Sequence, residues 1–247
     1  MEYIRHFAKG LGVQAEYSWT RALTNIPTTS WGATWQNPHN EKAEYAEQNG
    51  FPRHRLAFNY IYSLPVGRGR RYMSNARGVV DGFLGGWQVT GITIYQTGSS
   101  FSVGFQVPST YVGWWGGRAD RLSGVDPYAK QSGHNITKGV QWFNPSAFAP
   151  PQPWTWGDSQ AYSLWGPGSD NWDIGLQKSF RVPIRGLEAP RLTFRTDWFD
   201  ALNHFTPGNP SATIADTRDG GSPITTAGMI YSGSGNRTIQ LGLTFEF

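Results

Sequence analysis

The sequence contains no cysteine, few charged residues and no long apolar run, and each absence excludes a class of protein. Without cysteine, a disulfide framework, thiol catalysis and cysteine-ligated zinc are excluded. Charged residues make up 15% of the 247 positions, against about 25% in an average globular protein. No stretch approaches the roughly 20 consecutive apolar residues of a membrane-spanning helix, which excludes a helical membrane protein.

Glycine and aromatic residues are abundant instead, with 31 Gly, 12 Trp, 14 Phe and 11 Tyr. Low charge combined with many rings argues against a disordered chain. The formal net charge of +4, from 21 basic and 17 acidic residues, gives little support for binding to nucleic acid. Residues Met1–Gly10 carry charges and no apolar segment, so they do not form a secretory signal.

A period-two alternation of apolar and polar residues is the decisive signal, because successive side chains of a strand point to opposite faces. It is clearest from Arg237 to the end of the chain. There the apolar face consists of Ile239, Leu241, Leu243, Phe245 and Phe247, and the other face of Thr238, Gln240, Gly242, Thr244 and Glu246. This pattern predicts a strand with one face in an apolar environment.

Similar segments recur along the chain at Glu2–Phe7, Leu11–Trp19, Leu56–Leu64, Trp87–Thr97, Trp172–Phe180 and Leu192–Trp198. Trp87–Thr97 alternates less regularly, because Ile92 and Ile94 share the face of Gln88, but its β-branched content and length favour a strand. Most of the seven segments are about 9 to 12 residues long, as a tilted transmembrane strand requires. Strands of ordinary globular sheets are nearer 5 or 6 residues, so length favours a membrane barrel.

The connections between these segments alternate between two kinds. The shorter ones are Ala8–Gly10, Pro65–Gly86 and Arg181–Pro190, and the long ones are Arg21–Pro52, Gln106–Asn171 and Asn203–Asn236. Outer-membrane barrels have short periplasmic turns and long extracellular loops. The sequence therefore predicts an all-β antiparallel meander of about seven long strands, part of a transmembrane outer-membrane β-barrel with long extracellular loops.

Outward-facing rings should then form two girdles, one at each membrane interface. We expect Tyr17, Trp19, Tyr95, Trp172 and Trp198 at the extracellular level, and Tyr62, Trp87, Phe180, Phe245 and Phe247 at the periplasmic level. Seven strands are fewer than the even eight or more of a single-chain bacterial barrel. We therefore expect an open sheet with two unpaired edges.

Several blocks of sequence resemble the C-terminal half of the barrel of TonB-dependent receptors of the Oar-like, carboxypeptidase-regulatory-domain-containing type. The blocks are WFNPSAF at Trp142–Phe148, GPG at Gly166–Gly168, NWDIGLQKSF at Asn171–Phe180, LTFRTDWFDALNH at Leu192–His204, GNP at Gly208–Pro210 and the closing strand Ile239–Phe247. The resemblance implies a barrel of about 22 strands around a plug. It also implies import of a bulky ligand, such as a saccharide, siderophore or peptide, across a Gram-negative outer membrane with energy from TonB.

The chain lacks the plug, the TonB box, the N-terminal domain and the earlier strands of such receptors. Residues 1–247 are thus interpreted as a partial barrel in the cell outer membrane, truncated at its N-terminus. Its expected partners are outer-membrane lipid, the remainder of the barrel with its plug, and the TonB system through the missing part. The apolar positions of the last strand, Ile239 to Phe247, resemble the signal by which the barrel assembly machinery recognises its clients.

No catalytic motif is present: the sequence has no Gly-x-Ser-x-Gly elbow, His-Glu-x-x-His helix or Walker-type loop. We expect no enzymatic activity, no cofactor and no metal site. A metal-like group in the first long connection, His39, Glu41, Glu44 and Glu47, is better explained as a solvated loop face. Arg195 and Asp197 share the polar face of one strand, which favours a charge pair lining a wet lumen over a glycosidase pair.

Basic residues gather in Gly67–Arg71, in a connection expected on the periplasmic side, where proximity to lipid headgroups explains them without a ligand. Six tryptophans in the long connections are the best candidates for ligand contact, because rings can stack on an apolar sugar or siderophore face: Trp31, Trp35, Trp114, Trp115, Trp154 and Trp156. Two other hypotheses stay open. One is a soluble, tryptophan-rich β-sandwich that binds carbohydrate, and the other is an outer-membrane enzyme.

Overall fold

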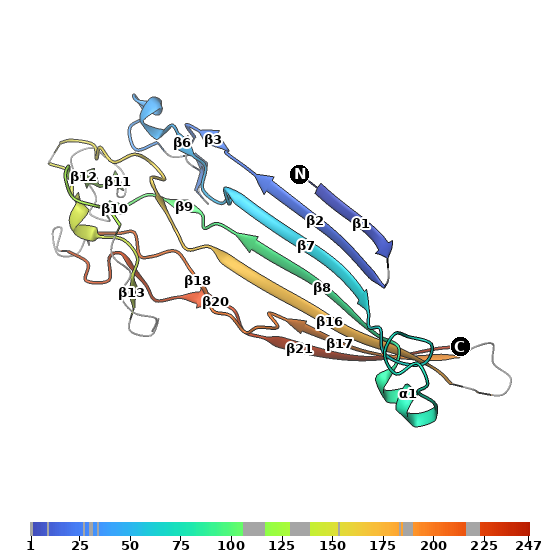
Figure 1. Cartoon of the computed structure of the whole chain (residues 1–247). Helices are drawn as coiled ribbons and strands as arrows, with labels where there is room; N and C mark the ends of the chain where they lie inside the picture. The colour runs from blue at the N-terminus through green and yellow to red at the C-terminus, as the bar shows by residue number, and fades with distance from the viewer. Residues whose placement is uncertain are drawn as a thin grey trace.

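The computed structural model describes residues 2–8, 10–26, 28–29, 32–33, 35–105, 117–128, 139–152, 154–182, 184, 190–215 and 223–247. Seven long strands form one antiparallel sheet in chain order (Figure 1). They are β1 (Glu2–Ala8), β2 (Leu11–Trp19), β7 (His54–Ser63), β8 (Trp87–Gln96), β16 (Ser169–Arg181), β17 (Arg191–Phe199) and β21 (Thr238–Glu246). Each strand expected from the alternation overlaps one of these, and the predicted meander is confirmed.

The sheet is open. Among the residues that the structure describes, β1 pairs with β2 alone and β21 pairs with β17 alone. The expectation of two free edges is therefore confirmed. An open edge exposes a row of backbone donors and acceptors that can pair with a further strand.

Backbone register separates the two faces of the sheet. On one face, Gln14 lies opposite Asn59, which lies opposite Ile92, which lies opposite Asp173. We call this the polar face. The next row, on the opposite face, runs through Val13, Tyr60, Gly91, Ile174, Trp198 and Ile239. We call it the apolar face.

Gly91 interrupts the side chains of the apolar face, and the ring of Tyr60 covers the space. A Cβ atom at Gly91 would lie 2.3 Å from the ring of Tyr60. Glycine inside a strand weakens it unless a neighbouring ring supplies the missing packing, as here.

Short paired segments lie at the end of the sheet where the long connections emerge (Figure 1). They are β3 (Leu23–Thr24) with β6 (Ala46–Glu47), β4 (Thr28–Thr29) with β5 (Gly32–Ala33), β9 (Ser100–Phe101) with β15 (Leu164–Trp165), β10 (Gly104–Phe105) with β11 (Gly117–Arg118), β12 (Asp120–Arg121) with β14 (Phe148–Ala149), β13 (Val140–Gln141) with β19 (Met229–Ile230), and β18 (Thr206–Pro207) with β20 (Gly233–Ser234). Two 3₁₀ turns, η1 (Glu41–Glu44) and η3 (Pro145–Ala147), accompany them. We call this region the loop end.

The loop end contains a hydrophobic core of its own, centred on Phe143. The ring centroid of Phe143 lies 5.8 Å from that of Phe101 and 5.9 Å from that of Phe148. Val103 and Ile214 are buried in the same cluster. Burial of these side chains stabilises the long connections, because removing an aromatic side chain from water contributes about 1.5 to 3 kcal/mol.

The opposite end of the sheet carries the shorter connections and one helix, α1 (Gly78–Leu84) (Figure 1). We call it the α1 end. Among the described residues, no helix combines the length and the apolar character needed to cross a membrane.

Strand bounds place the expected rings of the two girdles at opposite ends of the sheet. Tyr95 lies beside the loop end of β8 and contacts Trp172 near the start of β16, with ring centroids 6.0 Å apart. Trp87 begins β8 at the α1 end and contacts Phe194, with ring centroids 6.3 Å apart. The other members divide in the same way: Tyr17, Trp19 and Trp198 lie towards the loop end, and Tyr62, Phe180, Phe245 and Phe247 towards the α1 end.

Candidate functional site

The polar face of the sheet holds a hollow of about 690 Å³. Its polar lining comes from alternate positions of five strands and includes Gln14, Asn59, Gln88, Asp173, Gln177, Arg195 and Asp197. Alternation explains the lining, because every second residue of each strand reaches the same face. The hollow therefore offers amide, carboxylate and guanidinium groups together on one wall.

Arg195 and Asp197 form the ion pair expected on this face. The Nε atom of Arg195 donates to Oδ2 of Asp197 at 2.7 Å and to Oδ1 at 3.0 Å. Gly175 lies opposite Asp197, and a Cβ there would come within 2.8 Å of its Oδ1. The pair is exposed, so it contributes at most about 1 kcal/mol to stability; its chemical capacity is to bind polar groups and water.

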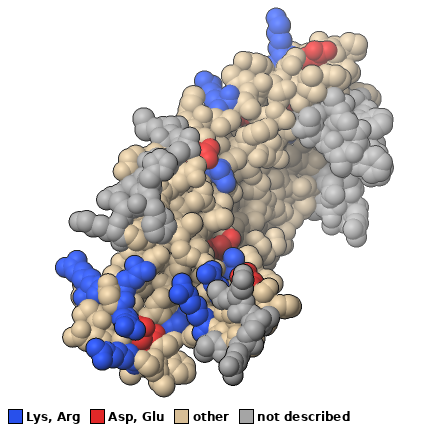
Figure 2. Space-filling view, turned by 90° about the vertical axis from the view of Figure 1, so that its right-hand side faces the viewer, with Lys and Arg blue, Asp and Glu red and all other residues tan. Residues whose placement is uncertain are grey.

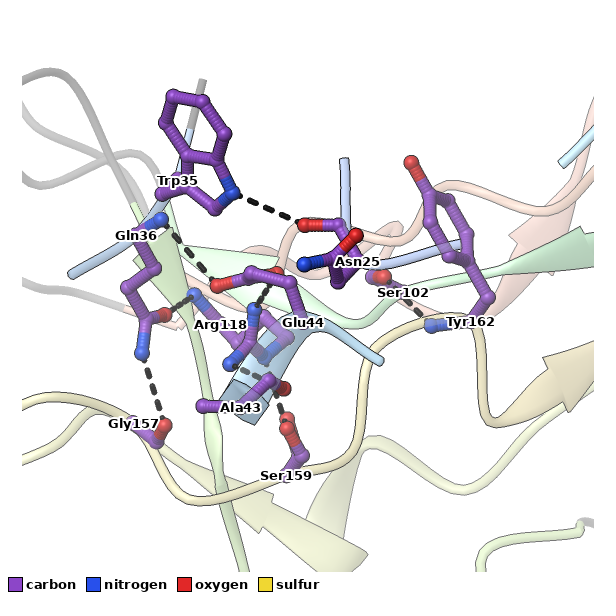
Figure 3. Close-up of polar contacts among 10 residues, drawn as sticks. All are labelled: Asn25, Trp35, Gln36, Ala43, Glu44, Ser102, Arg118, Gly157, Ser159 and Tyr162. Carbon is purple, nitrogen blue, oxygen red and sulfur yellow. Dashed lines mark hydrogen bonds and ion pairs between the residues drawn. The ribbon is translucent and has the colours of Figure 1, made fainter. Parts of the chain in front are cut away.

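Arg118 joins two long connections at the loop end, those between β2 and β7 and between β8 and β16, and Figure 3 shows its contacts. Its Nε donates to the carbonyl oxygen of Ser159 at 2.8 Å, one terminal nitrogen pairs with a carboxylate oxygen of Glu44, and the other donates to the carbonyl oxygen of Ala43 at 3.3 Å. Arg118 is 8% exposed and Glu44 is 4% exposed. A buried ion pair needs such additional hydrogen bonds, because both charges have lost their hydration.

The side chain of Gln36 forms two further hydrogen bonds between the same two long connections. Its Oε1 accepts from the backbone N–H of Arg118 at 2.5 Å, and its Nε2 donates to the carbonyl oxygen of Gly157 at 2.9 Å. A Cβ at Gly157 would come within 1.8 Å of the carbonyl oxygen of Arg118. The close approach of the two backbones therefore requires glycine at this position.

The interpretation of Glu44 as part of a solvated loop face is wrong. Glu44 lies in η1 and is buried against Arg118, while Glu47 is held by Arg21 at 3.2 Å and by Arg53 at 2.5 Å. Arginine partners thus occupy two of the three carboxylates of the metal-like group, those of Glu44 and Glu47. Among the described residues, no three His, Cys, Asp or Glu side chains are arranged to hold a metal ion.

A family model described as an outer membrane beta barrel domain matches residues 1–240. The chain belongs to this family. No curated protein and no solved structure matches the sequence. The division of the seven-stranded sheet into one apolar and one polar face suits this family, because the wall of an outer-membrane β-barrel is apolar towards lipid and polar towards the interior.

Three of the six candidate tryptophans of this barrel domain, Trp31, Trp114 and Trp115, lie outside the described residues. The other three, Trp35, Trp154 and Trp156, lie at the loop end. The indole of Trp35 is half-buried and donates to the carbonyl oxygen of Asn25 at 2.9 Å, which is loop packing. Trp154 is 69% exposed, with a left-handed φ of 69°. Their contact with a ligand stays a prediction.

The bond from Gln36 to Gly157 joins the chain next to Trp35 to the chain next to Trp156, which is half-buried. Packing of the long connections therefore brings two of the six candidates into one region. At the other end of the sequence, the apolar positions of β21, namely Ile239, Leu241, Leu243, Phe245 and Phe247, are all exposed. Their role as an assembly signal also stays a prediction.

Lys178 is a functional candidate that the sequence reasoning missed. It occupies an apolar-face position of β16, between Leu176 and Phe180, yet it is 3% exposed. Its Nζ donates to the carbonyl oxygen of Gly85, at the C-terminal end of α1, and lies 3.4 Å from that of Asp81. The signal was available, because a lysine stands where the alternation requires an apolar residue.

Tyr162 lies beside the Arg118–Glu44 pair at the loop end (Figure 3). Its backbone N–H donates to Oγ of Ser102 at 2.8 Å. Burial raises the pKa of the Tyr162 hydroxyl, and the negative charge of Glu44 raises it further, while Arg118 acts in the opposite direction. The neutral phenol is therefore the favoured form in the folded loops.

Proposed function

We propose that this barrel domain is the C-terminal part of a TonB-dependent receptor that takes up a bulky ligand, namely a saccharide, siderophore or peptide. The observation that carries the proposal is the open sheet with a polar inner wall. Its two free edges leave room for the further strands that such a wide barrel needs, and the polar wall suits a wet lumen or plug. The resemblance of the sequence blocks at 142–148, 166–180 and 192–210 supports the receptor type.

In this proposal the loop end is extracellular and the α1 end is periplasmic, because outer-membrane barrels extend their long connections outward. The packed core around Phe143 and the Arg118–Glu44 pair then hold the outer loops in a defined arrangement. A preorganised loop surface loses less conformational entropy when it binds a ligand. Exposed rings on that surface, such as Trp154, can stack on sugar or siderophore faces.

The soluble β-sandwich hypothesis requires two sheets that enclose a dry core about 10 Å thick. The seven long strands instead lie in a single sheet, and apolar side chains such as Leu241 and Leu243 are exposed on it. These observations favour a lipid-facing wall over a sandwich core.

Uptake measurements test the proposal. Cells that produce the intact receptor, and matched cells that lack TonB, receive three fluorescent probes: a dextrin oligosaccharide, a ferric catecholate siderophore and a short peptide. We expect uptake of one probe that depends both on the receptor and on TonB. Uptake that is unchanged without TonB would contradict the proposal.

A substitution in the outer loops identifies the binding surface. We expect Trp154→Ala to weaken binding of the transported probe roughly tenfold, because one stacking contact is lost. Tyr128→Ala is the matched control, since Tyr128 is also exposed at the loop end and is not among the candidate tryptophans. An equal effect of both substitutions would argue against a specific role for Trp154.

A further inference from the structure

The connection Pro65–Gly86, which we call the α1 segment, concentrates positive charge at the α1 end. It contains Arg68, Arg70, Arg71 and Arg77, all exposed, and a single acidic residue, Asp81. Figure 2 shows Lys and Arg side chains gathered over this end of the molecule, in the lower part of the view. Arg181 and Arg191, which are exposed and paired in register between β16 and β17, add to the same end.

The α1 helix lies against the apolar, lipid-facing side of the sheet. Lys178 and Trp87 both project from that side, since Lys178 is opposite Trp87 in register. The Nζ of Lys178 donates to the carbonyl oxygen of Gly85, and the indole Nε1 of Trp87 donates to that of Phe83 at 2.7 Å. Two contacts thus fix α1 outside the wall of the barrel.

The basic turn is attached firmly to the helix. The Oδ1 atom of Asp81 accepts from the backbone N–H of Arg68 at 2.6 Å. The backbones of Gly67 and Gly85 approach so closely that a Cβ on Gly67 would lie 2.5 Å from the Cα of Gly85, and Gly67 has a φ of 113°. The arginines and the helix therefore present one surface in a fixed relation.

The apolar side chains of α1 are not covered. Val79 is 73% exposed and Phe83 is 72% exposed, Val80 and Leu84 are also exposed, and no residue of the helix is buried. These four side chains continue the apolar surface that the sheet presents to lipid. Exposed apolar residues beside a basic cluster match a lipid interface, where side chains enter the acyl region and cations meet headgroups.

We propose that the α1 segment is a docking surface for anionic phospholipid in the leaflet around this end of the barrel. Val79, Val80, Phe83 and Leu84 enter the acyl boundary, and Arg68, Arg70, Arg71 and Arg77 bind headgroup phosphates. The occupant is a phospholipid because the surface is continuous with the lipid-facing wall and opposite in charge to the headgroup. The proposal rests on the orientation given under the proposed function, in which this end is periplasmic.

Fluorescence from a single label tests the proposal in the full chain refolded in detergent micelles, with the soluble fraction from size-exclusion chromatography taken for the assay in whatever oligomeric state it adopts. Because the sequence has no cysteine, Val79→Cys introduces a unique site for an environment-sensitive dye. Phosphatidylglycerol is added to the micelles, with phosphatidylcholine and lipopolysaccharide as separate arms. We expect a blue shift with phosphatidylglycerol at concentrations where the other two lipids have little effect, and we expect high salt to weaken it. The same dye at Asn49→Cys, in an exposed turn at the loop end, should not respond.

Charge removal provides the matched comparison. We expect Arg70→Gln with Arg71→Gln to raise the phosphatidylglycerol needed for half the shift roughly tenfold, since each arginine near an anionic surface adds severalfold to binding. Arg21→Gln with Lys42→Gln removes the same charge at the loop end. This variant should leave the phosphatidylglycerol concentration for half the shift unchanged. Native mass spectrometry of retained lipid gives a second readout of the same variants.

Three results would overturn the proposal: an equal shift with phosphatidylcholine, a stronger one with lipopolysaccharide, or no difference between the two charge variants. The lipid assay involves no transport and the uptake assay no change of lipid. Failure of this proposal is therefore distinguishable from failure of the proposed function.

Discussion

The ammonium group of Lys178 donates a hydrogen bond to the carbonyl oxygen of Gly85, joining the lipid-facing side of β16 to the end of α1. The Nζ atom also lies 5.0 Å from the ring centre of Phe180 and 5.6 Å from that of Trp87. A lysine on the lipid-facing side is costly unless its charge is met. The carbonyl groups at the end of a helix carry partial negative charge and supply that compensation.

Replacement of this lysine should release the helix and leave the sheet intact. We expect Lys178→Met to weaken the attachment of α1 by about 2 kcal/mol, because a charge-assisted hydrogen bond is lost while the apolar stem is kept. Amide hydrogen exchange within Gly78–Leu84 should accelerate roughly 30-fold. Exchange in β16 should not change, and Lys42→Met, at an exposed lysine, should have no effect. Unchanged exchange in α1 would show that the contact is unimportant.

The Arg118–Glu44 pair should be the most sensitive contact of the loop end. We expect Glu44→Gln to destabilise the packed loops by about 3 kcal/mol, because Arg118 then keeps a buried charge without its partner. The double variant Glu44→Leu with Arg118→Met should cost less than the sum of the single changes. Chemical denaturation followed by hydrogen exchange in residues 35–48 measures both.

Glu47→Gln is the control for that experiment, since the arginine partners of Glu47 are considerably more exposed than Arg118. Exposed pairs contribute about 0 to 1 kcal/mol. If Glu44→Gln costs no more than Glu47→Gln, the buried pair does not hold the loops together.

Alkaline pH should loosen the same loops through Tyr162. Its pKa is raised above 10.0 in the folded chain, chiefly by burial. As pH rises above 10.0, the Tyr162 hydroxyl of the unfolded chain loses its proton while that of the folded chain retains it. The free energy of unfolding of the loops therefore falls as pH rises. Below pH 10.0 the contribution of the protonated Tyr162 hydroxyl to the stability of the loops is fully present. We expect the free energy of opening of the loops to fall more between about pH 9 and about pH 11 in the unchanged chain than in Tyr162→Phe. Identical losses in the two chains would contradict this expectation.

The free edges of β1 and β21 should make the isolated chain associate. Unpaired backbone groups in hydrocarbon cost several kcal/mol each, and pairing with another copy removes that cost. We expect chain 1–247, refolded in detergent, to elute as oligomers or aggregates in size-exclusion chromatography with light scattering. A stable monomer whose β1 and β21 are paired with each other would instead indicate a small self-sufficient barrel.

Alternation was sufficient to predict the sheet, because burial in lipid on one side imposes a strict period of two on each strand. Leu11–Trp19 was placed correctly at both ends. Even Trp87–Gln96 was recognised, although Ile92 lies on the polar face, where it lines the hollow. Ile92 and Ile94 are tolerated there, because exposed apolar side chains are ordinary on protein surfaces.

The loop end was beyond the reach of the same reasoning. The Arg118–Glu44 pair joins residues 74 positions apart, and no local pattern predicts which distant connection a loop will pack against. The helix α1 was missed because its segment contains Gly78 and Gly82, both poor helix formers. Contacts with Lys178 and Trp87 hold the segment in place, so tertiary packing decides its structure.

The edge strand β21 also dictates the sequence of any strand that completes the wall beside it. Residues that pair across a sheet share a face, so the positions opposite Leu241 and Leu243 must tolerate hydrocarbon, whereas those opposite Gln240 and Thr244 must tolerate water. A shift of one residue in that pairing would exchange the two sets entirely. The free edge thus acts as a selective template. It accepts a neighbouring strand only in the register that places the apolar side chains of that strand on the apolar face.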